Sequence, residues 1–185
     1  MSEIEITDVA ALLTVLTRGA TADDGEGLDL LAHSLQCAAN LARVAPDDPE
    51  LQVAGLVHDL GTILSPGHPE SHARTGGNAV RALLGHRVAD LVAHHDQAKR
   101  YLVTVEPAYA ERLSPQSVAT LAVQGGVLAD HERGVFEAHP DADACVTLRR
   151  ADDEAKVPGL VVRPLEEWRG AVEACAGTAG RVTPR

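Results

Sequence analysis

Histidines and aspartates recur along this chain in an order that could bind two metal ions. The stretch Gly55 to Gly61, GLVHDLG, places His58 directly before Asp59 inside an otherwise apolar run. Adjacent side chains on a helix project about 100° apart, so each of these two ionisable groups needs its own partner. Either residue could pair with the other or with nearby backbone, whereas a metal ion would satisfy both.

Further candidate ligands lie on other segments, each within its own predicted helix. They are His33, His72, Asp152 and either His94 or His95, between which spacing alone does not choose. Imidazoles combined with carboxylates suit iron, manganese or zinc. Asp59 is the natural bridge between two metals, because a carboxylate has two oxygens and His58 beside it anchors one metal. His33 and Asp152 would then complete that metal site, and His72 with the later histidine would complete the other.

The alternative is that these histidines are ordinary structural residues. Nine histidines in 185 residues are enough for some spacing matches to be accidental. A single histidine on an apolar helix face, such as His33, is more often a core residue than a ligand. Four histidines have no role in the pattern and are expected at the surface or at helix ends: His68, His86, His131 and His139. The ordered set of six is therefore stronger evidence than the HD pair alone.

Helical patterns dominate the segments that must position these residues. Apolar residues make up 45% of the chain but aromatic residues only 2%, so Ala, Leu and Val must fill a core of close-packed helices. Helices are predicted over residues 7–19, 28–45, 49–64, 70–85, 86–105, 106–113, 114–126, 129–140, 141–156 and 163–177. No repeat or linker interrupts them. We predict one all-α domain over residues 1–176 and a flexible C-terminal tail over 177–185.

The charge and the cysteines argue against several classes of protein. A net charge of −11 lacks the basic surface expected of a nucleic-acid-binding protein, so an anionic substrate would need metals and local cations. No stretch approaches the ~20 apolar residues of a membrane span. Three cysteines without paired spacing, and no apolar leader, predict a reducing, cytoplasmic location. Whether the protein is a monomer or a homodimer stays open.

The order H…HD…D, with two further histidines before the last aspartate, resembles the dinuclear members of the HD-domain superfamily of metal-dependent enzymes. The resemblance implies an all-α HD-domain helical bundle with a dinuclear metal site in its core. Such members include phosphohydrolases and oxygenases, and the metal ligands alone do not separate these two chemistries.

Segments outside the ligands make the resemblance more specific. HSLQCA, AKRYL, VQGG and LRRADDEAK look like parts of the small diiron oxygenases that cleave 2-amino-1-hydroxyethylphosphonate and its trimethylammonio analogue. That resemblance implies two iron ions, mixed-valent Fe(II)/Fe(III), with O2 as co-substrate. The implied reaction is oxidative cleavage of the C–P bond of a small 1-hydroxyphosphonate, giving phosphate and a carboxylic acid. It also selects His95 over His94, because the family's ligand stands four residues before the Lys of AKRYL.

The same resemblance assigns residues to the substrate. The phosphonate is expected at Lys99, Ser117 and Arg149, and Glu26 is expected to meet the substrate's ammonium group or the lid. The spacing agrees, because Lys99 follows His95 by four residues and Arg149 precedes Asp152 by three, which puts each pair on one helix face. The alternative is that Lys99 and Arg149 are solvent-exposed residues at the ends of helix faces and bind no substrate.

Three positions depart from the family pattern and leave the exact substrate open. Asp23 stands where the family has a tyrosine, Thr62 where it has a further histidine, and Ala151 where it has a tryptophan. The first two are expected near the substrate. An alternative function is a dinuclear HD phosphohydrolase acting on a phosphomonoester or nucleotide through a metal-bound hydroxide. A non-catalytic metal-binding module is disfavoured because all six ligands are present.

Overall fold

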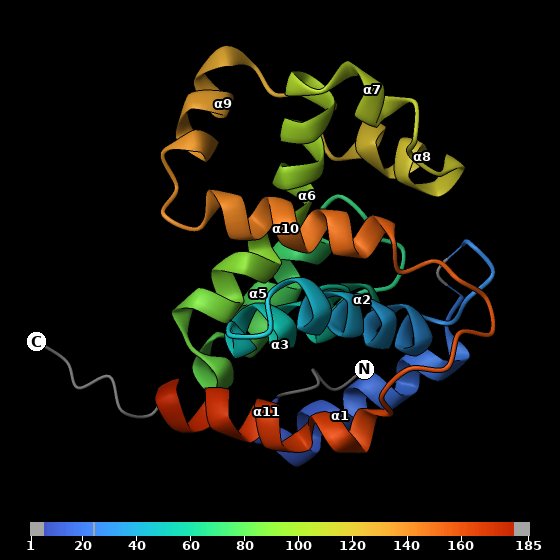
Figure 1. Cartoon of the computed structure of the whole chain (residues 1–185), viewed down its shortest axis with the longest axis vertical. Helices are drawn as coiled ribbons and strands as arrows, with labels where there is room; N and C mark the ends of the chain where they lie inside the picture. Colours follow the sequence, from blue (N-terminus) through green and yellow to red (C-terminus); the bar gives the residue numbers. More distant parts are fainter. Residues whose placement is uncertain (1–5, 24, 180–185) are drawn as a thin grey trace, which may run out of the picture.

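The computed structural model describes residues 6–23 and 25–179 (Figure 1). Within these residues the chain is helical, with one isolated bridge between Asp23 and Asp29 and no strand, so the predicted all-α fold is confirmed. In chain order the helices are α1 (Val9–Arg18), η1 (Gly19–Thr21), α2 (Leu30–Val44), α3 (Pro49–Val57), α4 (Leu60–Leu64), α5 (His72–Leu84), α6 (His86–Val105), α7 (Pro107–Ala110), α8 (Pro115–Val123), α9 (Asp130–Glu137), α10 (Ala142–Asp153) and α11 (Leu165–Ala179).

The long helix α6 organises the molecule. It packs against α3, α5 and α10, while α2 lies between α3 and α10. Helices α7, α8 and α9 gather at one end of α6, and α1 and α11 cover the opposite end of the bundle (Figure 1). Aliphatic side chains fill the core, as the composition predicts, and Trp168 of α11 is fully buried among them. Helices α2, α3, α5, α6 and α10 therefore surround a common centre.

Aspartate caps fix where two of these helices begin. The Asp29 carboxylate accepts a hydrogen bond of 2.7 Å from the N–H of Ala32 and starts α2. The Asp48 carboxylate accepts one of 3.0 Å from the N–H of Leu51, with Pro49 in the first turn of α3. Each cap satisfies an amide that the helix itself leaves without a partner. The starting points of α2 and α3 set which of their residues face the bundle centre.

The HD pair lies in a turn between two helices. Helix α3 ends at Val57 and α4 begins at Leu60, so the prediction of one helix over residues 49–64 was wrong at these two residues. Asp59 has φ −94° and ψ 12°, a sparsely allowed conformation that occurs often in active sites. On a continuous helix the two side chains would diverge by about 100°. The turn instead lets His58 and Asp59 reach the same place.

Close contact between α4 and α5 supports this turn. A Cβ atom at Gly61 would collide with the carbonyl oxygen of His72, so only glycine fits. The contact brings the start of α5 beside the HD pair, where His72 Nε2 lies 3.5 Å from Asp59 Oδ1. The last glycine of GLVHDLG thus has a packing role.

Two further predictions concern the ends and the surroundings of the chain. Helix α11 continues through Ala179, so residues 177–179 of the predicted tail are helical, and residues 180–185 lie outside the described part. Among residues 6–23 and 25–179, no helix has the length and apolar character needed to cross a membrane.

Candidate dinuclear metal site

Two triplets of side chains converge at the centre of the bundle. The first comprises His33, His58 and Asp152, and the second comprises Asp59, His72 and His95. Within each triplet, one donor atom from each residue lies within 4.8 Å of the others. Five places in the fold supply them: α2, the α3–α4 turn, α5, α6 and α10. The structure therefore brings together all six residues that the sequence predicts as ligands, which we call the metal cluster.

Asp59 lies between the two triplets and turns one carboxylate oxygen to each. Its Oδ2 atom lies 3.4 Å from His58 Nε2 and 3.7 Å from His33 Nε2. Its Oδ1 atom lies 3.5 Å from His72 Nε2 and 4.0 Å from His95 Nε2. This geometry fits a carboxylate that bridges two metal ions.

Backbone carbonyls orient all four histidines of the cluster. The Nδ1 atoms donate to the carbonyl oxygens of Ala155 (from His33, 3.0 Å), Gly55 (from His58, 2.8 Å), Pro69 (from His72, 2.7 Å) and Val92 (from His95, 2.7 Å). A carbonyl oxygen can only accept, so Nδ1 carries the hydrogen and the Nε2 atom of a neutral ring presents its lone pair. Outer hydrogen bonds of this kind orient metal-binding histidines.

The donor atoms of the cluster require positive charge between them. His33 Nε2 and His58 Nε2 are 3.2 Å apart, and His72 Nε2 and His95 Nε2 are 3.0 Å apart. Two unprotonated nitrogens at these separations repel unless a proton or a metal ion lies between them. A mixture of imidazole nitrogens and carboxylate oxygens suits iron, manganese or zinc. The donor set therefore fits two metal ions.

Protonation in the cluster agrees with metal binding. Burial raises the pKa of Asp59, but the neighbouring His58 and His72 outweigh it and hold that pKa well below its usual range. Burial also raises the pKa of Asp152, but the charge of the Arg149 guanidinium and the hydrogen bond with His33 outweigh it and hold that pKa well below its usual value. Both carboxylates are thus anionic at neutral pH, as metal ligands must be.

His33 and His95 differ in protonation within the cluster. Burial lowers the pKa of His33, but the hydrogen bond and the charge of Asp152 outweigh it and raise that pKa to about 9. The proton on His33 stands where a metal ion would replace it. Burial, followed by the charge of His72, holds the pKa of His95 well below its usual value, so His95 is neutral.

The remaining histidines lie outside both triplets. The His94 Nδ1 atom donates to the carbonyl oxygen of Asp90 at 2.7 Å, and its ring lies 4.7 Å from that of His139. The geometry therefore agrees with His95 as the residue of α6 that faces the cluster. The other three are His68, which pairs with Glu70, His86, which contacts Arg81, and the exposed His131.

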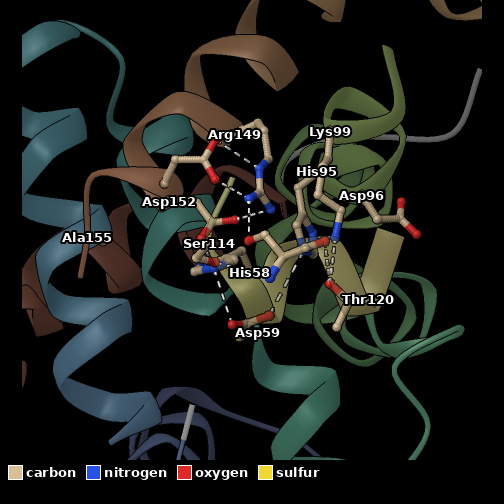
Figure 2. A network of polar contacts seen from close by, with 12 residues as sticks. His58, Asp59, His95, Asp96, Lys99, Ser114, Thr120, Arg149, Asp152 and Ala155 are labelled. Atoms are coloured by element: carbon tan, nitrogen blue, oxygen red, sulfur yellow. Dashed lines mark hydrogen bonds and ion pairs between the residues drawn. The ribbon is translucent and has the colours of Figure 1, made fainter. Parts of the chain in front are cut away.

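A cavity of about 540 Å³ opens onto the cluster and is lined by all four predicted substrate residues, Glu26, Lys99, Ser117 and Arg149. Its volume lies in the range of small-molecule sites. Figure 2 shows Arg149 bonded to Asp152 of the cluster and Lys99 bonded to Thr120. Of the three departures from the family pattern, Asp23 and Thr62 line the cavity, as expected, and Ala151 does not.

Lys99 presents a buried positive charge to this cavity. It is 2% exposed, and its Nζ atom donates to the hydroxyl of Thr120 at 2.8 Å. Burial, followed by the nearby charge of Arg149, lowers the pKa of Lys99 to about 8. Because a hydroxyl is neutral, this contact leaves the charge of Lys99 available to an anion.

Arg149 is held by carboxylates as well as facing the cavity. Its NH1 atom donates to Asp152 Oδ2 at 2.7 Å, and its NH2 atom pairs with Asp153 and donates to Ser117 Oγ at 3.2 Å. Its Nε atom donates to the Tyr109 hydroxyl at 3.1 Å. The guanidinium therefore contacts a carboxylate of the metal cluster and a hydroxyl of the cavity wall at the same time. Sequence reasoning missed Tyr109 and Asp153, for which the sequence holds no signal beyond the second aspartate of ADD.

Lys156 is a cavity residue to which the sequence analysis assigned no role. Its Nζ atom lies 2.6 Å from Glu26 Oε2 and 3.1 Å from the hydroxyls of Ser114 and Ser117. The signal that could have found it is its place four residues after Asp152, in the segment LRRADDEAK. Glu26, expected to meet a substrate ammonium group, thus meets an ammonium group of the chain itself.

Comparison with known proteins gives three results. Residues 30–152 match the family described as HD domain. A hydroxymethylphosphonate dioxygenase of Gimesia maris is 36% identical over 159 residues, which cover 81% of this chain and 79% of that protein. A 1-hydroxy-2-(trimethylamino)ethylphosphonate dioxygenase (glycine-betaine-forming) of Leisingera caerulea is 29% identical over 140 residues, which cover 71% of each chain. The matched HD-domain segment contains all six residues of the metal cluster.

Proposed function

This chain belongs to the HD-domain family of phosphonate oxygenases, and we propose that it uses two iron ions and dioxygen to cleave the C–P bond of a small 1-hydroxyphosphonate. The products would be phosphate and a carboxylic acid, which together contain both atoms of the dioxygen consumed. The observation that carries the proposal is one cavity in which Lys99, Ser117 and Arg149 face the metal cluster. The names of the two related dioxygenases support the same chemistry.

The cluster residues would hold the irons in two sites. His33, His58 and Asp152 would bind one ion, and His72 and His95 the other, with Asp59 between them. When bound as a mixed-valent Fe(II)/Fe(III) pair, the irons would supply the electron transfer and dioxygen activation that side chains lack. Zinc would fit the same donors but has no redox chemistry, which favours iron for an oxygenase.

The chain's own contribution is to bind and orient the substrate. Lys99 Nζ and Ser117 Oγ would donate hydrogen bonds to the phosphonate oxygens, with Arg149 behind Ser117 adding positive charge. Charge-assisted hydrogen bonds of this kind are the strong ones for a compact dianion. Binding the phosphonate at Lys99 and Ser117 would leave the hydroxyl-bearing carbon beside the metal cluster. Holding the reacting carbon in place lowers the entropic part of the barrier.

The test is to measure oxygen consumption and phosphate release together. Iron-loaded protein is incubated with hydroxymethylphosphonate and with 2-amino-1-hydroxyethylphosphonate, in air and under anaerobic conditions. The proposal predicts one phosphate per dioxygen consumed with at least one of these substrates, and no phosphate without oxygen. Phosphate release from phosphomonoesters at the same rate in both atmospheres would contradict it and would indicate the HD phosphohydrolase.

A further inference from the structure

A buried phenol lies directly behind Arg149. Tyr109 of α7 is 4% exposed and does not line the cavity. Its hydroxyl donates to Asp153 Oδ2 and accepts from Arg149 Nε at 3.1 Å. Burial raises the pKa of Tyr109 above its usual value, so the hydroxyl keeps its hydrogen at neutral pH. The phenol therefore links a cation that lines the cavity to a carboxylate that does not.

Two contacts fix the place of Tyr109 relative to α10. The N–H of Tyr109 donates to the carbonyl oxygen of Glu106 at 2.8 Å, at the start of α7. The Glu106 carboxylate in turn pairs with Arg150, the neighbour of Arg149 on α10. Helix α7 is thus joined to α10 by Arg150 at the surface and by Tyr109 in the interior.

Arg149 has two carboxylate neighbours for a single positive charge. Its side chain is 5% exposed and pairs with both Asp152 and Asp153. Asp152 Oδ1 also lies 3.1 Å from His33 Nε2, whereas Asp153 belongs to neither triplet of the metal cluster. A guanidinium and a carboxylate interact most strongly as a two-bond pair. Arg149 could complete such a pair with Asp153 through Nε, which lies 3.3 Å from Asp153 Oδ2.

The Tyr109 hydroxyl competes with that second bond. It donates to the same oxygen of Asp153 and offers Arg149 Nε a neutral acceptor instead. In this arrangement Arg149 NH2 reaches Ser117 Oγ at 3.2 Å. Ser117 Oγ also accepts from Lys156 Nζ at 3.1 Å, which fills both of its acceptor positions and leaves its own hydrogen for a ligand. Without the phenol, we expect the guanidinium to close on Asp153 and to leave Ser117.

We infer that Tyr109 is a positioning residue for phosphonate binding, because it keeps Arg149 turned toward Ser117 and away from a two-bond pair with Asp153. It acts through Arg149 and does not itself reach the cavity. This inference rests on the proposed function, since it explains how the anion site of the same cavity is held. Asp153 is then the competing group, and its removal should make the Tyr109 hydroxyl unnecessary.

The test is calorimetry on metal-loaded protein with methylphosphonate, which carries no reactive hydroxyl. Tyr109→Phe removes only the hydroxyl and should weaken binding about three- to tenfold, the worth of one neutral hydrogen bond. The double variant Tyr109→Phe/Asp153→Asn should recover most of this loss, because an amide attracts a guanidinium less than a carboxylate does. A phenol that only filled space would not be compensated by a change at Asp153.

The second tyrosine of the chain supplies the matched control. Tyr101 of α6 does not line the cavity, and its ring lies 4.8 Å from that of Phe136. Tyr101→Phe should leave the affinity for methylphosphonate unchanged. Every variant should keep two metals, because neither tyrosine nor Asp153 belongs to a triplet. With hydroxymethylphosphonate, Tyr109→Phe should raise KM more than it lowers kcat, as expected for lost substrate binding.

Two results would overturn the inference. One is a Tyr109→Phe variant that binds methylphosphonate as tightly as the wild type, and the other is a loss that Asp153→Asn does not restore. If Tyr109→Phe does not fold, Asp153→Asn alone serves, because it removes the competing group and should bind methylphosphonate at least as tightly as the wild type. Weaker binding by that variant would equally overturn the inference. Absence of oxygen consumption with every hydroxyphosphonate would end the proposed function, while these affinities still test Tyr109.

Discussion

The metal cluster and the substrate-binding part of the cavity are held in place by different kinds of contact. Lys99, Ser117, Arg149 and Lys156 line this second region, which we call the substrate end. In the cluster, the rings of His58, His72 and His95 each donate to a carbonyl three residues earlier in the chain. At the substrate end, Lys99 and Lys156 bond to other side chains. A carbonyl keeps its place when side chains are substituted, whereas a side-chain pair is lost with one substitution. We infer that the cluster fixes the chemistry and that the substrate end can change its specificity by single substitutions.

The largest expected effect is at Asp59, which lies between the two triplets. Asp59→Ala should bind less than one metal per chain and have no measurable oxygenase activity, because one carboxylate faces all four histidines. Metal analysis of the purified variant checks this. Asp96→Ala, which removes a cavity carboxylate outside both triplets, is the control and should keep two metals. Two metals bound to Asp59→Ala would refute the bridging role.

Adjacent histidines of α6 offer a sharper test of the cluster. His95→Ala should lose one metal and the activity, whereas His94→Ala should keep both, because His94 turns toward Asp90 and His139. Metal content and circular dichroism of the two variants give the comparison. The opposite pattern would mean that the wrong face of α6 has been assigned to the cluster.

A smaller effect is expected at the substrate end. Lys99→Ala should keep its fold and both metals, and should lose about ten- to hundredfold in kcat/KM because one charge-assisted hydrogen bond to the phosphonate is removed. Lys99→Arg should recover part of the loss, since a planar guanidinium fits the site differently from an ammonium group. Full efficiency of Lys99→Ala on every phosphonate, with normal metal content, would place the anion site elsewhere.

The pH dependence should show the same residue with a still smaller effect. Burial lowers the pKa of Lys99 to about 8, and only its protonated form attracts the phosphonate. The value of kcat/KM should therefore be constant below that pKa and fall as the pH rises through about 8. Lys99→Arg, which stays charged over this range, should lose the alkaline decline. An unchanged alkaline limb in Lys99→Arg would assign that limb to another group.

Much of this architecture is predictable from the sequence, because local signals set it. Pro49 and the aspartate caps mark helix starts. The order of histidines and aspartates predicts the six residues that meet at one centre. The turn at His58 and Asp59 was missed because the apolar pattern continues through it. The turn leads into a tertiary contact between Gly61 and His72, which the apolar pattern does not describe.

The substrate end was harder to predict for a similar reason. Glu26 and Lys156 come from loops far apart in the sequence, and periodicity does not describe how loop side chains pair. Gln36, from the family-like segment HSLQCA, bonds to the backbone N–H and carbonyl oxygen of Val157, the residue after Lys156. The resemblance to the family singles out both HSLQCA and LRRADDEAK, but the contact between these two segments is seen only in the folded structure.

The most direct test of the account is an anaerobic EPR titration of the iron-loaded protein with hydroxymethylphosphonate. We expect the signal of a coupled Fe(II)/Fe(III) pair, which requires both triplets to be filled, and a change in that signal as the substrate binds. Lys99→Ala should give the same starting signal and need about ten- to hundredfold more substrate for the same change. A protein with two bound irons and no coupled signal, or a coupled signal that saturating hydroxymethylphosphonate leaves unchanged, would contradict a dinuclear iron centre that meets its substrate in this cavity.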